Sequence, residues 1–352
     1  MRNSIRRAAL HLLKSAGVFR LVGDSRWRRA RLLILCYHGI ALEDEHQWRP
    51  ALYLEPARLE QRLELLRNGR YNVLPLGEGL RQLYAGALPP RSVAITFDDG
   101  TYDFYKLAYP LLKRSGFPFT VYQTTYYSEN PRPVFNLICS YMLWKRRGAL
   151  LDKGQALGLS PIMDLRTEAR RQAIVRSLEE ISERENWTGS QKNELASRLA
   201  ALLEIDYEAL VAKRILQVMS PQEVALLAQQ GVDFQLHTHR HRMPKDEALF
   251  RREIRDNRES LRRSGLHQFV HFCYPSGAHD PKFLPWLVSE GVVSATTCDP
   301  GLASSKSNAL LLPRLVDTTR RSLLEFESWL TGVGDLLVMH RTAIPRNLPL
   351  SD

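Results

Sequence analysis

The stretch Ser92-Val-Ala-Ile-Thr-Phe-Asp-Asp-Gly100 leads an apolar segment of strand length straight into two adjacent carboxylates, Asp98 and Asp99. The glycine after them lets the backbone turn sharply. Asp-Gly pairs are common in turns, so this stretch taken alone predicts a buried strand that ends in a turn. Whether the carboxylates have a chemical role depends on the residue types at the ends of the other strands.

Apolar runs of this kind alternate with helical patterns along the chain. A further helix begins at Pro221 after Ser220 and stops at Gly231. Repeated strand, helix, strand units predict an α/β fold with mostly parallel pairing, either a doubly wound sheet or a barrel. We expect strands at 32–37, 93–97, 119–123, 232–236, 270–274 and 292–296, and helices at 56–68, 103–115, 247–263 and 282–289.

A histidine-rich stretch, Gln235-Leu-His-Thr-His-Arg-His-Arg-Met-Pro244, repeats the pattern of a strand followed by metal-binding residue types. If the strand continued, His237, His239 and His241 would share one face and could form a three-histidine metal site. If the chain turns after residue 237, His237 and His241 meet, and Asp99 can supply an oxygen ligand beside an open position for water. The alternative is a solvated loop that binds metal only adventitiously.

Each of the two stretches with metal-binding residue types lies directly after a predicted strand. Asp98 and Asp99 come directly after one strand, and His237 comes after another. Barrel enzymes place their chemistry at the C-terminal ends of strands, so this placement favours a barrel.

The chain of 352 residues is longer than most single domains, and its pattern changes between residues 128 and 218. Pro131 and Pro133 open this region, and charged helical stretches replace the strands. We therefore expect a domain over residues 31–345 that is interrupted by a helical insertion at 128–218, either a lid or an adjunct packed on the main domain.

The charge of the chain is concentrated at its start. The composition is that of a globular protein, with 44% hydrophobic and 25% charged residues and a formal net charge of +11. Residues 1–31 contain nine Lys or Arg and a single acid, Asp24, so the remainder is close to balanced. This distribution argues against nucleic acid as a partner of the main domain.

Residues 1–30 predict a basic amphipathic extension. Apolar residues recur at helical spacing, among them Ile5, Leu12 and Phe19, while Arg6, Arg7 and Lys14 lie off that stripe. Such a helix could lie peripherally on an anionic membrane surface, or it could dock on the protein's own body.

Cysteine usage and hydropathy bear on location. The four cysteines are scattered without a Cys-x-x-Cys pair, which favours a reduced compartment. We find no pattern of a secretory signal and no apolar run long enough for a transmembrane helix. We therefore expect a cytoplasmic protein, with possible peripheral contact at the cytoplasmic face of the membrane.

Two motifs together resemble those of the polysaccharide deacetylase family, the carbohydrate esterases that include chitooligosaccharide, peptidoglycan and poly-N-acetylglucosamine deacetylases. Thr96-Phe-Asp-Asp-Gly100 resembles the first motif, and His237-Thr-His-Arg-His241 the second. Phe272-Cys-Tyr-Pro-Ser-Gly277 resembles the family's proline-containing groove motif, and Leu35–Ile40 extends the resemblance toward the start. The resemblance implies a distorted (β/α) barrel of about seven strands, a divalent metal, commonly zinc, and removal of N-acetyl groups from an amino sugar.

The resemblance also implies roles for individual residues. Asp99, His237 and His241 would bind the metal, and Asp98 would act as general base. The general acid would be a histidine, and two compete for the role. We prefer His38 in Tyr37-His38, since it ends an unambiguous strand; His340 in Val338-Met-His340 is the reserve.

The chain departs from the family pattern in two places. The family's third motif carries an Arg that holds the base, and Cys273 stands at the aligned position, with Ser276 where a Tyr is usual. Either another Arg, for which Arg314 is the candidate, supplies the contact, or Asp98 is held less firmly. A fourth motif with Asp and Trp is not found.

The sequence thus predicts a metal-dependent hydrolase that deacetylates an N-acetylated saccharide, for instance a lipid-linked precursor. One alternative is a saccharide-binding or assembly protein that has kept the barrel and lost turnover. Another is an esterase or amidase that acts on a different acyl group at the same metal site.

Overall fold

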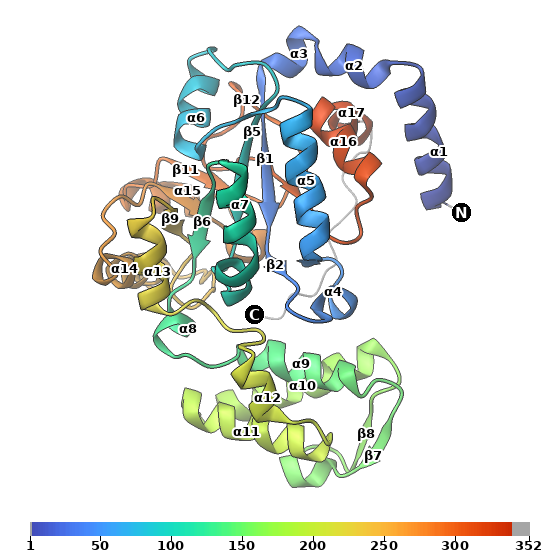
Figure 1. Cartoon of the computed structure of the whole chain (residues 1–352). Helices are drawn as coiled ribbons and strands as arrows, with labels where there is room; N and C mark the ends of the chain where they lie inside the picture. Colours follow the sequence, from blue (N-terminus) through green and yellow to red (C-terminus); the bar gives the residue numbers. More distant parts are fainter. Residues whose placement is uncertain (1, 340–352) are drawn as a thin grey trace. The chain divides into compact units, whose positions relative to one another are not determined.

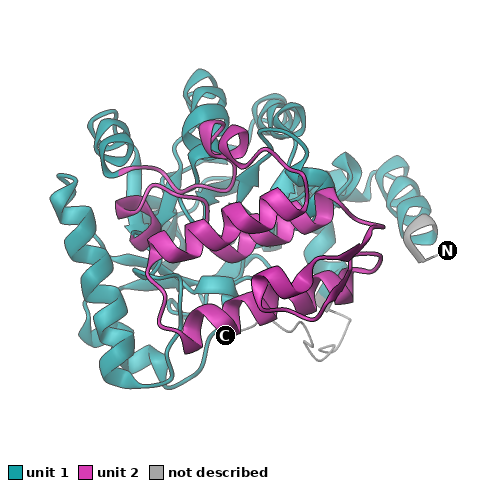
Figure 2. Cartoon of the chain, turned by 90° about the horizontal axis from the view of Figure 1, so that it is seen from below, with its two compact units in different colours: residues 1–125, 221–350 teal, residues 126–220, 351–352 magenta. Residues whose placement is uncertain are grey.

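The computed structural model describes residues 2–339 (Figure 1). These residues divide into two compact units, shown in teal and magenta in Figure 2. The barrel unit comprises residues 2–125 and 221–339, and the insertion unit comprises residues 126–220. Within the described residues, no helix is both long and apolar enough to cross a membrane.

The barrel unit is built on a curved sheet in which the central strands are all parallel (Figure 1). The short β4 (Asn72–Val73) adds to β5 in parallel, and β12 (Ala303–Ser304) pairs antiparallel with β1 at the edge. The central strands, in their order across the sheet, are β11 (Ser294–Thr296), β10 (His271–Cys273), β9 (Asp233–Leu236), β6 (Thr120–Gln123), β5 (Ser92–Phe97) and β1 (Arg31–Tyr37).

One short segment links the two ends of this sheet. β13 (Leu315–Val316) pairs in parallel with β1, while Leu312, just before it, forms a parallel bridge with Thr296 of β11. With β13, the six central strands make seven described strands around the core, and the short β4 is a further parallel strand beside β5. The α/β fold and the distorted (β/α) barrel of about seven strands are therefore confirmed.

The strands form because their residues are apolar on both faces, and β1 and β5 are buried almost throughout. Their register brings the strand ends together. Tyr37 lies opposite Phe97, and Leu236 lies opposite both Gln123 and Phe272. The residues just beyond these strands therefore gather at one rim of the barrel.

Helices between the strands cover the outside of the barrel (Figure 1). α5 (Pro56–Asn68) and α14 (Glu247–Arg263) have the bounds that the sequence predicts. The predicted helix at 103–115 instead begins with a π-helical turn, Phe104–Ala108, that leads into α7 (Tyr109–Ser115). The other helices here are α4 (Glu45–Trp48), α6 (Leu76–Tyr84), α13 (Pro221–Gln229) and α15 (Phe283–Ser289), and β2 (Gly39–Ile40) pairs with β3 (Tyr53–Leu54).

The two ends of the described chain pack together in the barrel unit. α1 (Arg2–Ser15), α2 (Val18–Gly23) and α3 (Arg26–Arg29) precede the first strand, and α16 (Leu323–Thr331) and α17 (Val333–Met339) come after the last. α1 contacts α16, and α2 contacts both α16 and α17.

The insertion unit is mainly helical. Its helix α9 (Phe135–Lys145) is buried along much of its length and packs against α10 (Glu168–Arg184) and α11 (Gly189–Leu202). The remaining elements are α8 (Tyr126–Glu129), α12 (Tyr207–Ala212), a short 3-10 helix (Gly154–Leu157) and the antiparallel pair β7 (Leu150–Asp152) and β8 (Ile162–Asp164).

Candidate active site

The turn after β5 directs two neighbouring carboxylates to different partners. Asp99 adopts a left-handed backbone conformation with φ of 71°, and the next residue, Gly100, has φ of 70°. A side chain at position 100 would collide with Gln123, because a Cβ there would lie 1.9 Å from its Oε1. Glycine is therefore required at this position, and the strained turn separates the directions of Asp98 and Asp99.

Asp99 meets two histidines at the barrel rim. Its Oδ1 lies 3.1 Å from His237 Nε2 and 3.2 Å from His241 Nε2. His237 is buried, whereas the side chains of Asp99 and His241 are about one third exposed, so solvent reaches the cluster from one side. The three ligand atoms lie within 4.8 Å of one another.

The hydrogen bonding of His237 tests whether this cluster fits a metal ion. The carbonyl of Cys273, which can only accept, lies 2.9 Å from His237 Nδ1. Nδ1 therefore donates, and in the neutral ring the lone pair of Nε2 faces the Asp99 carboxylate. A cation must then lie between the two acceptors: either a proton, which Asp99 favours against the effect of burial by raising the pKa of His237, or a metal ion. One carboxylate and two imidazoles suit a divalent metal such as zinc, with a side left open.

The third histidine of the stretch points elsewhere. β9 ends at Leu236, and positive φ angles at Thr238 and His241 turn the chain back on itself. His239 is buried beside Thr125, whose Oγ1 lies 2.9 Å from its Nδ1. The sequence allows two geometries, and the structure has the second: the chain turns after residue 237 into a loop, and His237 and His241 meet while His239 does not join them.

Arg314 binds Asp98 with both nitrogens of its guanidinium end. Nη1 donates to Oδ1 and Nη2 to Oδ2, each over 2.7 Å, and both side chains are almost completely buried. Nη1 also donates to Thr96 Oγ1, and Nε donates to the Thr297 carbonyl. Burial alone would raise the pKa of Asp98, but the charge and hydrogen bonds of Arg314 outweigh it and hold that pKa far below its usual range. Because Cys273 stands where the family pattern has an Arg, either another Arg holds Asp98 or this carboxylate is held less firmly. The structure has the first arrangement, with Arg314 as that other Arg.

Two buried thiols complete the surroundings of Asp98. Cys36 Sγ lies 3.4 Å and Cys273 Sγ 3.3 Å from Asp98 Oδ2. Burial raises the pKa of both thiols well above the usual range, so they remain protonated and donate to the carboxylate. Cys273, which stands where the family pattern has an Arg, thus contacts the carboxylate that such an Arg would hold.

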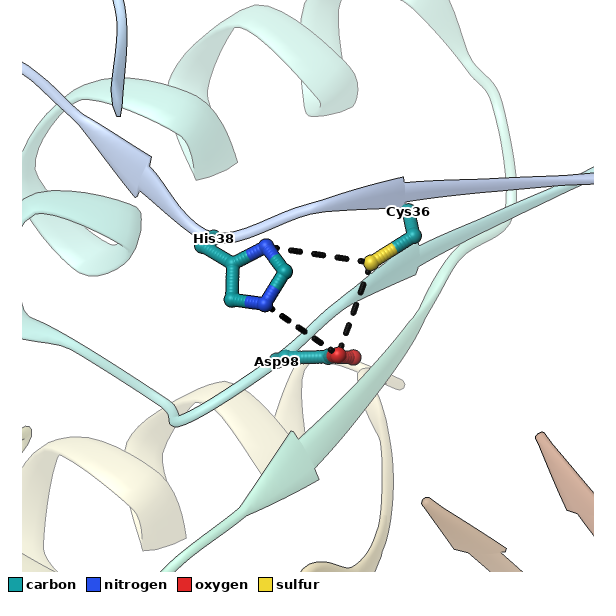
Figure 3. Close-up of side chains that lie close together, drawn as sticks. All are labelled: Cys36, His38 and Asp98. Carbon is teal, nitrogen blue, oxygen red and sulfur yellow. Dashed lines mark hydrogen bonds and ion pairs between the residues drawn. The ribbon is translucent and has the colours of Figure 1, made fainter. Parts of the chain in front are cut away.

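His38 comes from the end of β1 and reaches the same carboxylate (Figure 3). Its Nε2 lies 3.6 Å from Asp98 Oδ2, and its Nδ1 lies 3.8 Å from Cys36 Sγ. Its side chain is 16% exposed, which leaves it accessible to a bound molecule. The competing candidate, His340, lies outside the described residues.

Asn257 is a residue of this region that the sequence analysis missed. It is fully buried on α14, and its Oδ1 accepts from the backbone N–H of His237 over 3.0 Å. Its Nδ2 donates to the Gln123 carbonyl and to Thr125 Oγ1. Asn257 therefore ties the end of β6 to the start of the loop that carries His237, His239 and His241, which we call the histidine loop. The available signal was an Asn in register with Phe250, Ile254 and Leu261 on the apolar face of a predicted helix.

Comparison with known families agrees with this geometry. The sequence profile of the family described as polysaccharide deacetylase matches residues 85–159 and 188–293. The chain belongs to the polysaccharide deacetylase family. It is therefore a hydrolase that acts on carbon–nitrogen bonds other than peptide bonds, and it is metal-dependent, as this family is. A search of curated proteins gives no match.

Solved structures of other deacetylases share the fold. The deacetylase PplD from Streptococcus pyogenes, in complex with acetate, is 19% identical, with a TM-score of 0.54 over 83% of this chain and 94% of its own. A polysaccharide deacetylase from Bacillus cereus is 14% identical, with a TM-score of 0.52 over 86% and 69%. IcaB from Ammonifex degensii is 16% identical, with a TM-score of 0.51 over 86% and 97%. At these identities the likeness concerns the fold alone.

Proposed function

We propose that the protein removes N-acetyl groups from an amino-sugar saccharide at a zinc ion held by Asp99, His237 and His241. The observation that carries the proposal is the meeting of Asp99 Oδ1 with two imidazole Nε2 atoms at 3.1 and 3.2 Å. The carbonyl of Cys273 fixes His237 in the tautomer that a metal needs. A set of two nitrogens and one oxygen with an open side is typical of hydrolytic zinc sites.

A bound metal of this kind lowers the pKa of water and stabilises negative charge on a substrate carbonyl oxygen. Asp98 acts as general base and accepts a proton from the attacking water. The ion pair with Arg314 keeps Asp98 ionised and fixed in orientation, since Arg314 is itself anchored by Thr96 and Thr297.

His38 acts as general acid. The departing amide nitrogen must gain a proton, because a free amide anion is too basic to leave. His38 Nε2 lies 3.6 Å from Asp98 Oδ2, so the proposed base and acid border the same small volume. The proton that Asp98 takes from water and the proton that His38 gives to nitrogen balance over one turnover.

The domain that carries this activity is proposed to span residues 31–345, with residues 128–218 inserted. We also propose that the substrate is a lipid-linked saccharide handled at the cytoplasmic face of the membrane. The free thiols Cys36, Cys139, Cys273 and Cys298 support a reduced compartment, and the basic residues 1–30 support contact with an anionic surface.

The test combines metal analysis of the purified protein with acetate release from a panel of N-acetylated saccharides. Asp98→Asn should abolish release while the protein keeps its metal, whereas His237→Ala should lose both. Unchanged acetate release in both variants would refute the mechanism. Release from O-acetylated members of the panel alone would replace the proposed amidase reaction with an esterase reaction.

A further inference from the structure

The first helices of the chain carry the most exposed large apolar side chains of the part that the structure describes. Among the described residues, Leu21 is 72% exposed, Leu12 71% and Ile5 64%, and no other large hydrophobic residue exceeds these values. Ile5 and Leu12 are seven residues apart and lie on one face of α1, and Leu21 lies on α2. We call Ile5, Leu12 and Leu21 the outer residues.

These helices are already docked through their opposite faces. Leu10 of α1 and Phe19 of α2 are buried in a cluster with Leu324 and Val333 of the C-terminal helices. Leu13, Val18 and Val22 pack against the same cluster. The outer residues are therefore not needed to hold α1 and α2 on the barrel unit.

Ion pairs reinforce the docked face. Arg6 pairs with Glu325, and Lys14 pairs with Glu327, both on α16. The extension is thus folded before it meets any partner, and the two possibilities that the sequence left open for it are not exclusive. One face of each helix docks on the protein's own body, and the other faces solvent.

Unpaired positive charge accompanies the outer residues. Arg7, Arg20, Arg26 and Arg29 are exposed, and no ion pair involving them is found among residues 2–339. The acid nearest to them in the sequence is Asp24, which is paired with Arg91; its pKa is lowered mainly by Arg91 and further by the charges of Arg20 and Arg29. Exposed apolar side chains on α1 and α2, together with exposed arginines on α1, α2 and α3, are complementary to the acyl boundary and the anionic headgroups of a phospholipid bilayer.

We propose that the outer faces of α1 and α2 bind the surface of an anionic phospholipid bilayer, with Ile5, Leu12 and Leu21 entering the headgroup region. The proposal of a binding surface is supported by the residues of these helices alone. Its use, which is to bring the active site to a lipid-linked saccharide, rests on the proposed function. Because the helices are docked in advance, binding carries little of the entropic cost of folding an amphipathic segment on the membrane.

The test measures co-sedimentation of the full chain with vesicles of phosphatidylcholine alone or mixed with phosphatidylglycerol. The protein should bind the mixed vesicles, and binding should weaken as salt is raised, since arginine attraction to lipid headgroups is screened. A variant with Ile5→Ser, Leu12→Ser and Leu21→Ser should bind roughly tenfold or more weakly. The matched control replaces Leu150 and Ile162, which are similarly exposed in the insertion unit, and should bind like the wild type.

Acetate release from a water-soluble N-acetylated saccharide separates this proposal from the proposed function. The triple variant should keep wild-type release, because the outer residues lie on helices that contribute nothing to the active site. Equal binding by the triple variant and the wild type, or no binding to mixed vesicles by either, would overturn the membrane proposal. Dimerisation of the wild type that the triple variant loses, without vesicle binding, would assign the surface to a second copy of the chain and also overturn it.

Discussion

Arg314 reaches Asp98 from the segment that closes the barrel, and its two terminal nitrogens each lie 2.7 Å from a different carboxylate oxygen. The family pattern expects an Arg at the position of Cys273, which is the last residue of β10 in this chain. Arg314 Nη2 lies only 3.0 Å from Cys273 Sγ, so the guanidinium occupies space next to the expected position. The same electrostatic contact thus comes from the segment just before β13.

Arg314→Lys should lower kcat roughly a hundredfold, because a single ammonium cannot hold both carboxylate oxygens and the base loses its orientation. Metal content should stay at the wild-type level, since the guanidinium of Arg314 donates to Asp98, Thr96 and Thr297 and not to the proposed ligands. Steady-state kinetics with metal analysis checks both statements. Wild-type kcat in this variant would show that Asp98 needs no two-point anchor.

A complementary test moves the arginine from position 314 to position 273. Arg314→Ala leaves a buried, unpaired carboxylate, and we expect a loss of stability of about 3–5 kcal/mol together with a loss of activity. Adding Cys273→Arg to Arg314→Ala should recover part of both, because the vacated space adjoins residue 273. Thermal unfolding and acetate release are the measurements. No recovery of either quantity would mean that residue 273 cannot take over the contact.

The histidine loop offers a matched pair of variants. His241→Ala should greatly reduce metal affinity, since it removes one of two imidazoles facing Asp99. His239→Ala removes an imidazole of the same loop that contacts Thr125 and should leave the metal content unchanged. Metal content after dialysis against a weak chelator separates the two variants. Loss of metal from His239→Ala alone would reverse the assignment of ligands.

The proposed acid can be distinguished from a binding residue by its leaving-group dependence. His38→Gln should lower kcat for an N-acetylated saccharide by roughly two to four orders of magnitude, because the amine leaves only after protonation. An aryl acetate with a nitrophenolate leaving group needs no such proton, so its hydrolysis should fall much less. Equal losses for the two substrates would indicate that His38 binds or orients the substrate and donates no proton to it.

The fold could be predicted because its parallel strands are buried on both faces and therefore read as continuous apolar runs, as in Leu32–Tyr37 and Val93–Phe97. The closing segment has no such signature. β13 is two residues long, and its link to β11 is a single bridge through Leu312, so it has too few residues to show a period. The predicted strands at 270–274 and 292–296 are shorter in the structure, where exposed Val270 and Val293 lie outside the paired residues.

The candidate site could be predicted in part for a similar reason. Residues that come directly after long strands, such as His38, Asp98 and His237, are placed by the register of those strands. The contacts of Cys36, Asn257 and Arg314 depend on which side chains meet across the barrel, and a sequence pattern states only that such residues are buried or polar. Arg314 could be named as a candidate because the resemblance exposed a missing charge, whereas nothing pointed to Asn257 except its place on an apolar helix face.

Asp103 gives a prediction about stability and pH. Burial raises the pKa of its carboxyl to about 8, and the charge of the buried Glu45 adds to the effect. Because the folded-state pKa lies above the ordinary value of 3.8, the folded protein binds this proton more tightly than the unfolded chain. The resulting stability is complete below about pH 4 and is lost as the pH rises through about 8. Asp103→Asn keeps a neutral side chain of similar shape, so it should remove this dependence.

The measurement is the free energy of unfolding by urea for both proteins at several pH values between about 5 and 8.5, a range that starts above the ordinary pKa of 3.8 and passes through the folded-state value of about 8. Wild-type stability should fall relative to Asp103→Asn by about a few kcal/mol across this range, since each unit of pKa shift corresponds to about 1.4 kcal/mol. Taking the difference between the two proteins cancels titration of the histidines, which both share. The control Asp152→Asn, at a carboxylate in an exposed position of the insertion unit, should behave like the wild type. Parallel curves for the wild type and Asp103→Asn would show that Asp103 is already ionised in the folded protein at neutral pH.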